Sequence, residues 1–69
     1  MKIKIGIIGC GAIGTRLAKF IDKKLIQTAH VATLCDTDRK KAKRLSCALK
    51  AKPEITNLLS LVKNNDLII

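Results

Sequence analysis

Three glycines lie close together directly after an isoleucine-rich run near the start of the chain. They belong to the segment Gly9-Cys10-Gly11-Ala12-Ile13-Gly14, which has the pattern Gly-x-Gly-x-x-Gly. Between a strand and a helix, this pattern is typical of a turn that binds the pyrophosphate of a dinucleotide. The first glycine permits the tight turn, the second lets the phosphates approach the backbone, and the third lets the helix pack closely on the sheet. All six residues are therefore candidate cofactor-binding residues.

An acidic residue follows the glycine turn at the distance that this chemistry requires. Asp36 ends the next apolar run, 22 positions beyond Gly14. A carboxylate there accepts hydrogen bonds from the adenosine ribose and repels a 2′-phosphate. Its alternative role is to cap the following helix, which Thr37 or Asp38 can also do. Arg39 can reach a 2′-phosphate or lie over the adenine, so the pattern favours NAD as the cofactor and leaves NADP open.

Two other residues with reactive side chains are weaker candidates. Cys10 lies inside the glycine turn, where the position requires only a small side chain, and a nucleophilic role is disfavoured. His30 is the single histidine and begins the second apolar run, at the strand end opposite the expected ligand crevice, so an ordinary surface histidine is the favoured interpretation. The sequence contains no Ser/His/Asp set, carboxylate pair or metal-ligand cluster. We therefore predict no catalytic residue and no metal site within it.

Strands and helices must position these residues, and the apolar spacing predicts where they lie. The runs 2–8 and 29–35 are short and rich in apolar residues, which predicts strands buried on both faces. After the glycine turn the apolar residues have helical spacing. The predicted buried stripe of this first helix consists of Ile13, Leu17, Phe20 and Ile21.

The second half of the chain continues the alternation. A second helix is predicted to begin near Asp38, and the residues it should bury are Ala42, Leu45 and Leu49. Pro53 requires a connection over 51–55, with room for a short edge strand. A third helix is predicted to begin near Thr56, and its apolar residues are Leu58, Leu59 and Val62. The run 66–69 is typical of the opening of another buried strand.

This alternation predicts an α/β fold, the N-terminal half of a doubly wound, Rossmann-type parallel sheet that is truncated. The first strand should be central, with the second beside it and the 66–69 strand on its other side. A strand buried on two faces needs more neighbours than 69 residues supply. We therefore expect residues 1–69 to be the N-terminal part of a dinucleotide-binding domain, with the remainder of that domain and a substrate domain absent from this chain.

Composition narrows the classes of function. The chain has 14 Lys and Arg against 5 Asp and Glu, a net charge of +9 that permits binding to many kinds of anion. Phe20 is the one aromatic residue, so there is no stacking platform for nucleic acid, and the basic cluster 39–44 is interpreted as a solvated helix face. The longest apolar run, Ile5–Gly14, is about half a membrane span. Three cysteines without a CxxC pair favour the cytoplasm.

The segment Lys4–Gly14, followed by Leu17-Ala18, closely resembles the opening of L-aspartate dehydrogenases, and Asp66–Ile69 is similar to the start of their next strand. This resemblance implies NAD(P)-dependent oxidative deamination of L-aspartate to iminoaspartate, a reaction that feeds NAD biosynthesis, in which the cofactor accepts the α-hydride. It implies that the intact enzyme binds a dinucleotide and a small amino-acid substrate. We also expect the intact enzyme to be a homo-oligomer.

The resemblance further implies a second domain with the substrate pocket and a catalytic histidine. His30 does not match the position of that histidine, so only Gly9, Gly11, Gly14 and Asp36 are carried over from the family. We therefore expect the 69-residue chain alone to be inactive.

Other families and other classes of protein remain open. Homoserine dehydrogenases, dihydrodipicolinate reductases and the glucose-fructose oxidoreductase group open in a similar way. A stand-alone dinucleotide-binding module and a basic nucleic-acid-binding protein are the alternatives from other classes. Salt-dependent affinity for DNA without affinity for a dinucleotide would indicate the last of these. We expect no partner membrane and no nucleic-acid partner.

Overall fold

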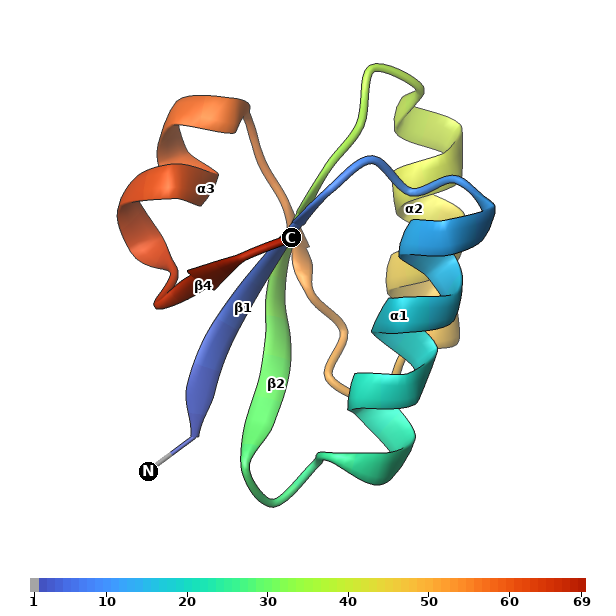
Figure 1. Ribbon diagram of the computed structural model, residues 1–69. Helices are drawn as coiled ribbons and strands as arrows, with labels where there is room; N and C mark the ends of the chain where they lie inside the picture. Colours follow the sequence, from blue (N-terminus) through green and yellow to red (C-terminus); the bar gives the residue numbers. More distant parts are fainter. Residues whose placement is uncertain (1) are drawn as a thin grey trace.

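A computed structural model describes residues 2–69 and has one parallel sheet of order β3-β2-β1-β4 (Figure 1). The strands are β1 (Ile3–Ile8), β2 (Ala29–Cys35), β3 (Glu54–Ile55) and β4 (Leu67–Ile68). The helices are α1 (Ala12–Lys24), α2 (Arg39–Ala48) and α3 (Leu58–Asn64). The predicted α/β class and the predicted strand order are therefore confirmed: β1 pairs with β2 on one side and with β4 on the other.

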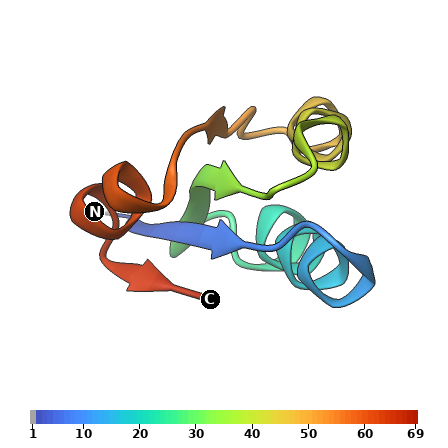
Figure 2. The same ribbon diagram turned by 90° about the horizontal axis from the view of Figure 1, so that it is seen from above.

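The helices form two layers on opposite faces of the sheet. Figure 2 shows α1 and α2 together on one face and α3 on the other. The chain moves from β1 to β3 in one direction and then crosses through α3 to β4 on the far side of β1. The order therefore reverses between β1 and β4, and the carboxyl ends beside this reversal are where doubly wound sheets bind their ligands.

The second helix follows its prediction closely. Asp38 is the N-cap of α2, and its side chain accepts hydrogen bonds from the backbone N–H groups of Lys40 and Lys41 at 3.0 and 3.4 Å. The residues expected to be buried here are all in the core: Ala42, Leu45 and Leu49. This helix is positioned by its own local sequence, a cap followed by apolar residues at helical spacing.

The predicted buried stripe of α1 is wrong in three of its four residues. Ile21 is buried, but Ile13, Leu17 and Phe20 expose 77%, 39% and 55% of their surface. These three residues therefore lie on an exposed side of α1 and not on the side that packs in the core. The buried apolar residues of α1 are Ala18 and Ile21, and they continue a line that begins at Gly14, one position after Ile13.

The rotation of α1 follows from its contact at Gly14. A Cβ atom at Gly14 would collide with the carbonyl oxygen of Gly9, so the helix touches the preceding turn at that point. The line Gly14, Ala18 and Ile21 continues this contact along the helix, and Ala18 and Ile21 are buried. One residue further round, buried Asp22 accepts backbone hydrogen bonds from Lys50 and Ala51 at 2.8 and 3.1 Å.

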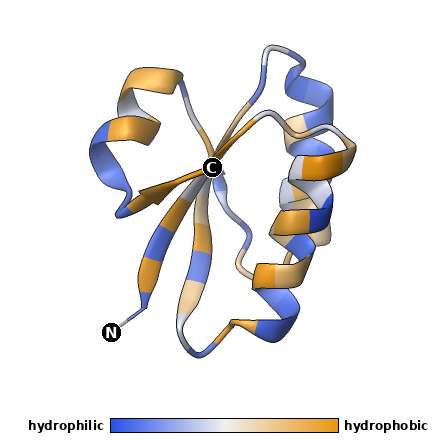
Figure 3. Ribbon diagram, viewed as in Figure 1, coloured by the Kyte–Doolittle hydropathy of each residue, from blue (hydrophilic) through white to orange (hydrophobic). Residues whose placement is uncertain are grey.

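The third helix contains the apolar residues that predicted it, but the residue it buries is a different one. It begins at Leu58 after an Asn57 cap, and its one buried residue is Leu61. The three predicted apolar residues are exposed by about half or more: Leu58 at 53%, Leu59 at 66% and Val62 at 48%. The hydrophobic segments of α3 and β4 are visible in Figure 3. Leu61 is selected because it faces Gly6 of β1, where an added Cβ would lie 2.7 Å from the Leu61 side chain.

The last strand has the predicted position but not the predicted burial. β4 pairs in parallel with β1, yet Leu67 and Ile68 expose 50% and 39% of their surface. β4 is an edge strand of the sheet. Since no further element covers it within residues 2–69, its side chains remain accessible.

Candidate functional site

The glycine turn lies at the carboxyl end of β1, beside the reversal in strand order. Gly9 has φ +90°, in the left-handed region that favours glycine, and its N–H donates to the Cys35 carbonyl at 2.8 Å. Gly11 is the N-cap of α1 and supplies no capping side chain, and the first turn of the helix contains no acidic residue. The first N–H groups of α1 therefore have neither a capping side chain nor a carboxylate in the same turn, which is the arrangement that the predicted phosphate site requires.

The three glycines differ in the space around them. A side chain at Gly14 would meet the backbone of Gly9, whereas a Cβ at Gly11 would have no atom within 4 Å. The predicted structural roles of Gly9 in turning and Gly14 in close packing therefore have a geometric basis. The open space at Gly11 is what an approaching pyrophosphate requires, and that role stays a prediction.

Asp36 lies against the glycine turn. Its Oδ2 accepts the backbone N–H of Cys10 at 2.5 Å, and its Oδ1 accepts the backbone N–H of Asp38 at 2.8 Å. These hydrogen bonds, that from Asp38 first and that from Cys10 second, lower the pKa of Asp36 below its ordinary value. Asp36 is therefore an ionised carboxylate beside the turn, and the alternative that it caps α2 is wrong because Asp38 is the cap.

Cys10 is a buried residue of the hydrophobic core. Its side chain is only 4% exposed, and its pKa is raised by burial first, then by the charge of Asp36 and by Cys35. Thr15 Oγ1 donates to the Cys10 carbonyl at 3.1 Å, so the backbone at this position is fixed as well. Burial and a raised pKa both oppose thiolate chemistry, in agreement with the prediction that Cys10 is no nucleophile.

This burial makes a prediction about thiol reactivity. Cys47 is exposed and Cys10 is buried, so a maleimide is expected to modify Cys47 first and Cys10 at least about tenfold more slowly. Mass spectrometry of a labelling time course, followed by peptide mapping, measures both rates. Any slow labelling of Cys10 should slow further with NAD, because the thiol belongs to the phosphate turn. Comparable rates for the two thiols would contradict the buried position.

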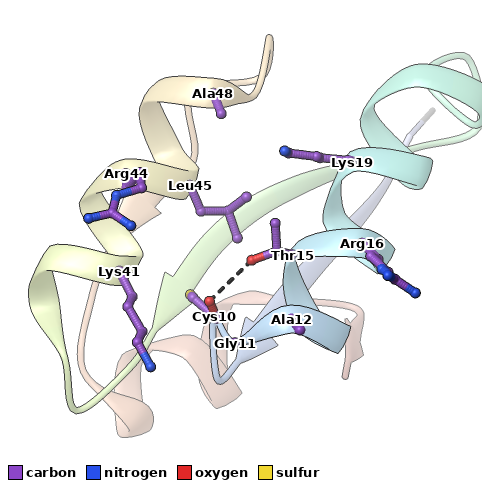
Figure 4. A pocket seen from close by; sticks show the side chains of 10 residues that line it. All are labelled: Cys10, Gly11, Ala12, Thr15, Arg16, Lys19, Lys41, Arg44, Leu45 and Ala48. Carbon is purple, nitrogen blue, oxygen red and sulfur yellow. Dashed lines mark hydrogen bonds between the residues drawn. The ribbon is translucent and has the colours of Figure 1, made fainter.

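Two cavities are lined by residues of the glycine turn, and a third is lined by Asp36. A cavity of about 520 Å³ between α1 and α2 is lined by Cys10, Gly11 and Ala12 (Figure 4). A second, of about 480 Å³, lies at the β1/β4 reversal and is lined by the glycine turn, Ile13 and Ile69. Asp36 lines a third, of about 540 Å³.

Arg39 is separated from the glycine turn. It lines the third cavity together with Asp36 and the 55–58 connection, and it does not line the cavity between α1 and α2. The structure therefore brings the glycine turn and Asp36 together and leaves Arg39 on another side of Asp36. The basic residues that do line the α1–α2 cavity are Arg16, Lys19, Lys41 and Arg44, which sequence analysis did not select. The sequence feature that could have identified them is the three-residue spacing between the two basic residues on each helix.

His30 lies where it was expected, away from the turn. It pairs with Lys4 at the amino end of β2 and is half-buried. Within the described residues 2–69, no group of three or more His, Cys, Asp and Glu side chains is placed to hold a metal ion. Over the same residues, none of the helices has the length and apolar character needed to cross a membrane.

Comparison with known protein families shows to which family this chain belongs. Residues 9–69 match the family model described as homoserine dehydrogenase, NAD binding domain. The chain belongs to this family. The match begins at the first glycine of the turn and includes Asp36, all three helices and β4. A Rossmann-like, NAD-binding domain, with NAD as the cofactor, is thereby confirmed.

The chain is also similar to several proteins named L-aspartate dehydrogenase. The protein from Methanosarcina acetivorans is 40% identical over 68 residues, 97% of this chain and 25% of that protein. The one from Methanosarcina mazei is 38% identical over the same shares. That from Methanocaldococcus jannaschii is 42% identical over 50 residues, 72% of this chain and 19% of that protein. The resemblance is confirmed, and the chain spans about a quarter of these relatives.

Proposed function

We propose that this chain holds the adenosine diphosphate half of NAD in an L-aspartate dehydrogenase. The observation that carries the proposal is the similarity to relatives of that name across 97% of the chain, glycine turn included. In the proposed enzyme the amino acid loses its α-hydrogen as a hydride and is oxidised to the imine. When bound, NAD supplies the hydride acceptor, and residues of this chain bind the adenosine diphosphate half of the cofactor.

The proposed binding site has three parts. The backbone of Gly9–Gly14, with Cys10, Ala12 and Ile13 contributing main-chain and not side-chain groups, receives the pyrophosphate at the start of α1. The positive end of the α1 dipole stabilises the phosphate charge. Asp36 accepts hydrogen bonds from the adenosine ribose, since its oxygens have lone pairs left beyond their two backbone partners. Arg39 lines the same cavity as Asp36, which supports a role for Arg39 on the adenine side of the ribose.

Replacement of Asp36 tests the ribose assignment. Asp36→Ala is expected to weaken NAD by about tenfold and NADP by less, because it removes an acceptor for the 2′-hydroxyl and a repulsion against a 2′-phosphate. Calorimetric titration of the full-length variant with each dinucleotide measures the ratio. Asp38→Ala is the matched control: it removes a neighbouring carboxylate that caps α2 and should leave the ratio unchanged. An unaltered ratio in Asp36→Ala would contradict the ribose role.

The substrate is tested with the full-length protein. NADH formation from L-aspartate, with no NADH from L-homoserine, is the expected result. The family description makes homoserine the second candidate substrate. Activity on homoserine and not on aspartate would overturn the proposed substrate and leave the dinucleotide site standing.

The wider organisation of the protein belongs to the same proposal. We place residues 1–69 in the N-terminal part of a dinucleotide-binding domain, with the rest of that domain and a substrate domain elsewhere in the protein. The greater length of the relatives supports this arrangement. A homo-oligomer and a cytoplasmic location are proposed as well, the latter supported by three free cysteines. The 69-residue chain by itself should produce no NADH from aspartate.

A further inference from the structure

Side chains from other elements hold the backbone of Cys10, in the middle of the glycine turn, on both sides. The Cys10 N–H donates to Asp36 Oδ2 at 2.5 Å. The Cys10 carbonyl oxygen accepts the hydroxyl of Thr15 in α1 at 3.1 Å, the dashed line in Figure 4. Both chain neighbours of Cys10 are glycines, which by themselves would let the adjoining peptide groups rotate with little steric resistance. The orientation of these peptide groups therefore depends on the two side chains.

The hydrogen bond from Thr15 is not the usual one for a threonine in a helix. A Ser or Thr hydroxyl in a helix commonly bonds the carbonyl three or four residues earlier. Here the carbonyl four residues earlier, that of Gly11, accepts the Thr15 N–H at 2.8 Å, and the hydroxyl reaches one residue further, beyond the start of α1. Among residues 2–69, no second group donates to the Cys10 carbonyl. One hydroxyl therefore holds this carbonyl.

The direction of the Gly11 N–H follows from this bond. The peptide bond between Cys10 and Gly11 is trans, so its N–H points opposite to its carbonyl oxygen. Because that oxygen points at Thr15, the Gly11 N–H points away from Thr15, and it donates to no other group of residues 2–69. Gly11 is exposed, and a Cβ on it would have no atom within 4 Å. The turn therefore presents an unpartnered donor beside open space.

We propose that Thr15 is a positioning residue for dinucleotide binding, since its hydroxyl holds the peptide group between Cys10 and Gly11 in the orientation that suits the pyrophosphate. The inference rests on the proposed dinucleotide site and names what keeps its turn in the binding conformation. Without the hydroxyl the carbonyl has no partner, and rotation of the peptide group exchanges the positions of the N–H and the carbonyl oxygen. A carbonyl oxygen on the open side repels phosphates, whereas an N–H attracts them. A turn that is fixed in advance binds more tightly, because less freedom is lost on binding.

Replacement of Thr15 by valine removes the hydroxyl and nearly keeps the shape of the side chain. In the full-length protein, Thr15→Val is expected to weaken NAD about tenfold and ADP to the same extent, because both contain the pyrophosphate. Thr15→Ser retains the hydroxyl and should bind both ligands within about twofold of the wild type. Calorimetry measures the dissociation constants. Thr28→Val is the matched control, because it makes the same change at an exposed residue directly before β2, at the opposite end of that strand from the turn, and should change neither.

A role of Thr15 in folding alone gives a different result. Urea unfolding measures the stability of each variant, and the stoichiometry of the calorimetric titration measures the fraction of protein that is folded. A merely structural threonine would lower the urea midpoint and leave the dissociation constant of the folded protein unchanged. A positioning residue changes the dissociation constant at unchanged stoichiometry.

The outcomes separate this inference from the proposed function. Weaker binding of both ligands by Thr15→Val, with recovery in Thr15→Ser, supports the role of the hydroxyl. The role is overturned if Thr15→Val binds NAD within about twofold of the wild type, if NAD is weakened and ADP is not, or if Thr15→Ser loses as much affinity as Thr15→Val. In each of these cases the wild type still binds NAD, and the proposed function stands. If the wild type binds neither NAD nor ADP, the proposed function fails and the role of Thr15 fails with it.

Discussion

Replacing Gly11 with valine is expected to weaken NAD binding by roughly a hundredfold or more while the protein remains folded. The open space next to Gly11 is large enough for a side chain in the free protein, since a Cβ there meets no atom within 4 Å. The backbone angles, φ −76° and ψ −163°, also suit residues other than glycine. The branched side chain therefore occupies only the space that the pyrophosphate needs.

Calorimetry with NAD and urea unfolding, both on the full-length protein, check the two halves of this prediction. The free energy of unfolding should fall by about 1 kcal/mol, because valine is a poorer N-cap residue than glycine. Tight NAD binding by the valine variant would show that the phosphates do not approach the chain at Gly11.

Gly14→Ala is expected to have the opposite signature. Its single added methyl group would collide with the Gly9 carbonyl oxygen, which is backbone and cannot rotate away. Either α1 moves off the sheet or the turn at Gly9 changes shape. We expect a loss of about 3 kcal/mol in the free energy of unfolding, at the upper end of the cost of overpacking.

Urea denaturation followed by circular dichroism measures this loss. Gly11→Ala is the matched control, because it adds the same methyl group three residues earlier, where no atom is near. Its unfolding free energy should fall by about 1 kcal/mol, the cost of a poorer N-cap, which is well below the loss expected for Gly14→Ala. Equal stability of Gly14→Ala and Gly11→Ala would mean that α1 does not contact the turn as described.

The elements that were predicted correctly are those that local sequence determines. The cap at Asp38 and the burial of Leu45 follow from residues within α2 itself. The rotation of α3 depends on a contact far away in the sequence, whereas the rotation of α1 depends on how Gly14 fits against the backbone of the preceding turn. Gly14 meets the turn at Gly9, and Leu61 fits against Gly6, which is 55 residues away. An apolar spacing shows that a helix is amphipathic, but it does not identify which of two adjacent apolar lines faces the sheet.

In the candidate site, too, the parts determined by local sequence were predictable and the part that depends on helix packing was not. The glycine turn and Asp36 were recognisable because a turn between strand and helix, and a carboxylate at the next strand end, recur at fixed spacing. The basic lining of the cavity between α1 and α2 was not recognisable because Lys19 and Lys41 belong to different helices. Only the packing of α1 beside α2 shows that the basic cluster on α2 has a counterpart on α1. Charge on one helix by itself was reasonably interpreted as a solvated face.

The exposed line of Ile13, Leu17 and Phe20 on α1 affects how residues 1–69 behave in concentrated solution. Two forces act between such molecules: the net charge of +9 keeps them apart, and the apolar line draws them together at contact. The repulsion acts over about 10 Å at 0.1 M salt and over shorter distances as salt rises, whereas the apolar contact is not screened. Light scattering should therefore increase on adding salt to this chain, the reverse of the salting-in that a strongly basic protein would ordinarily suggest.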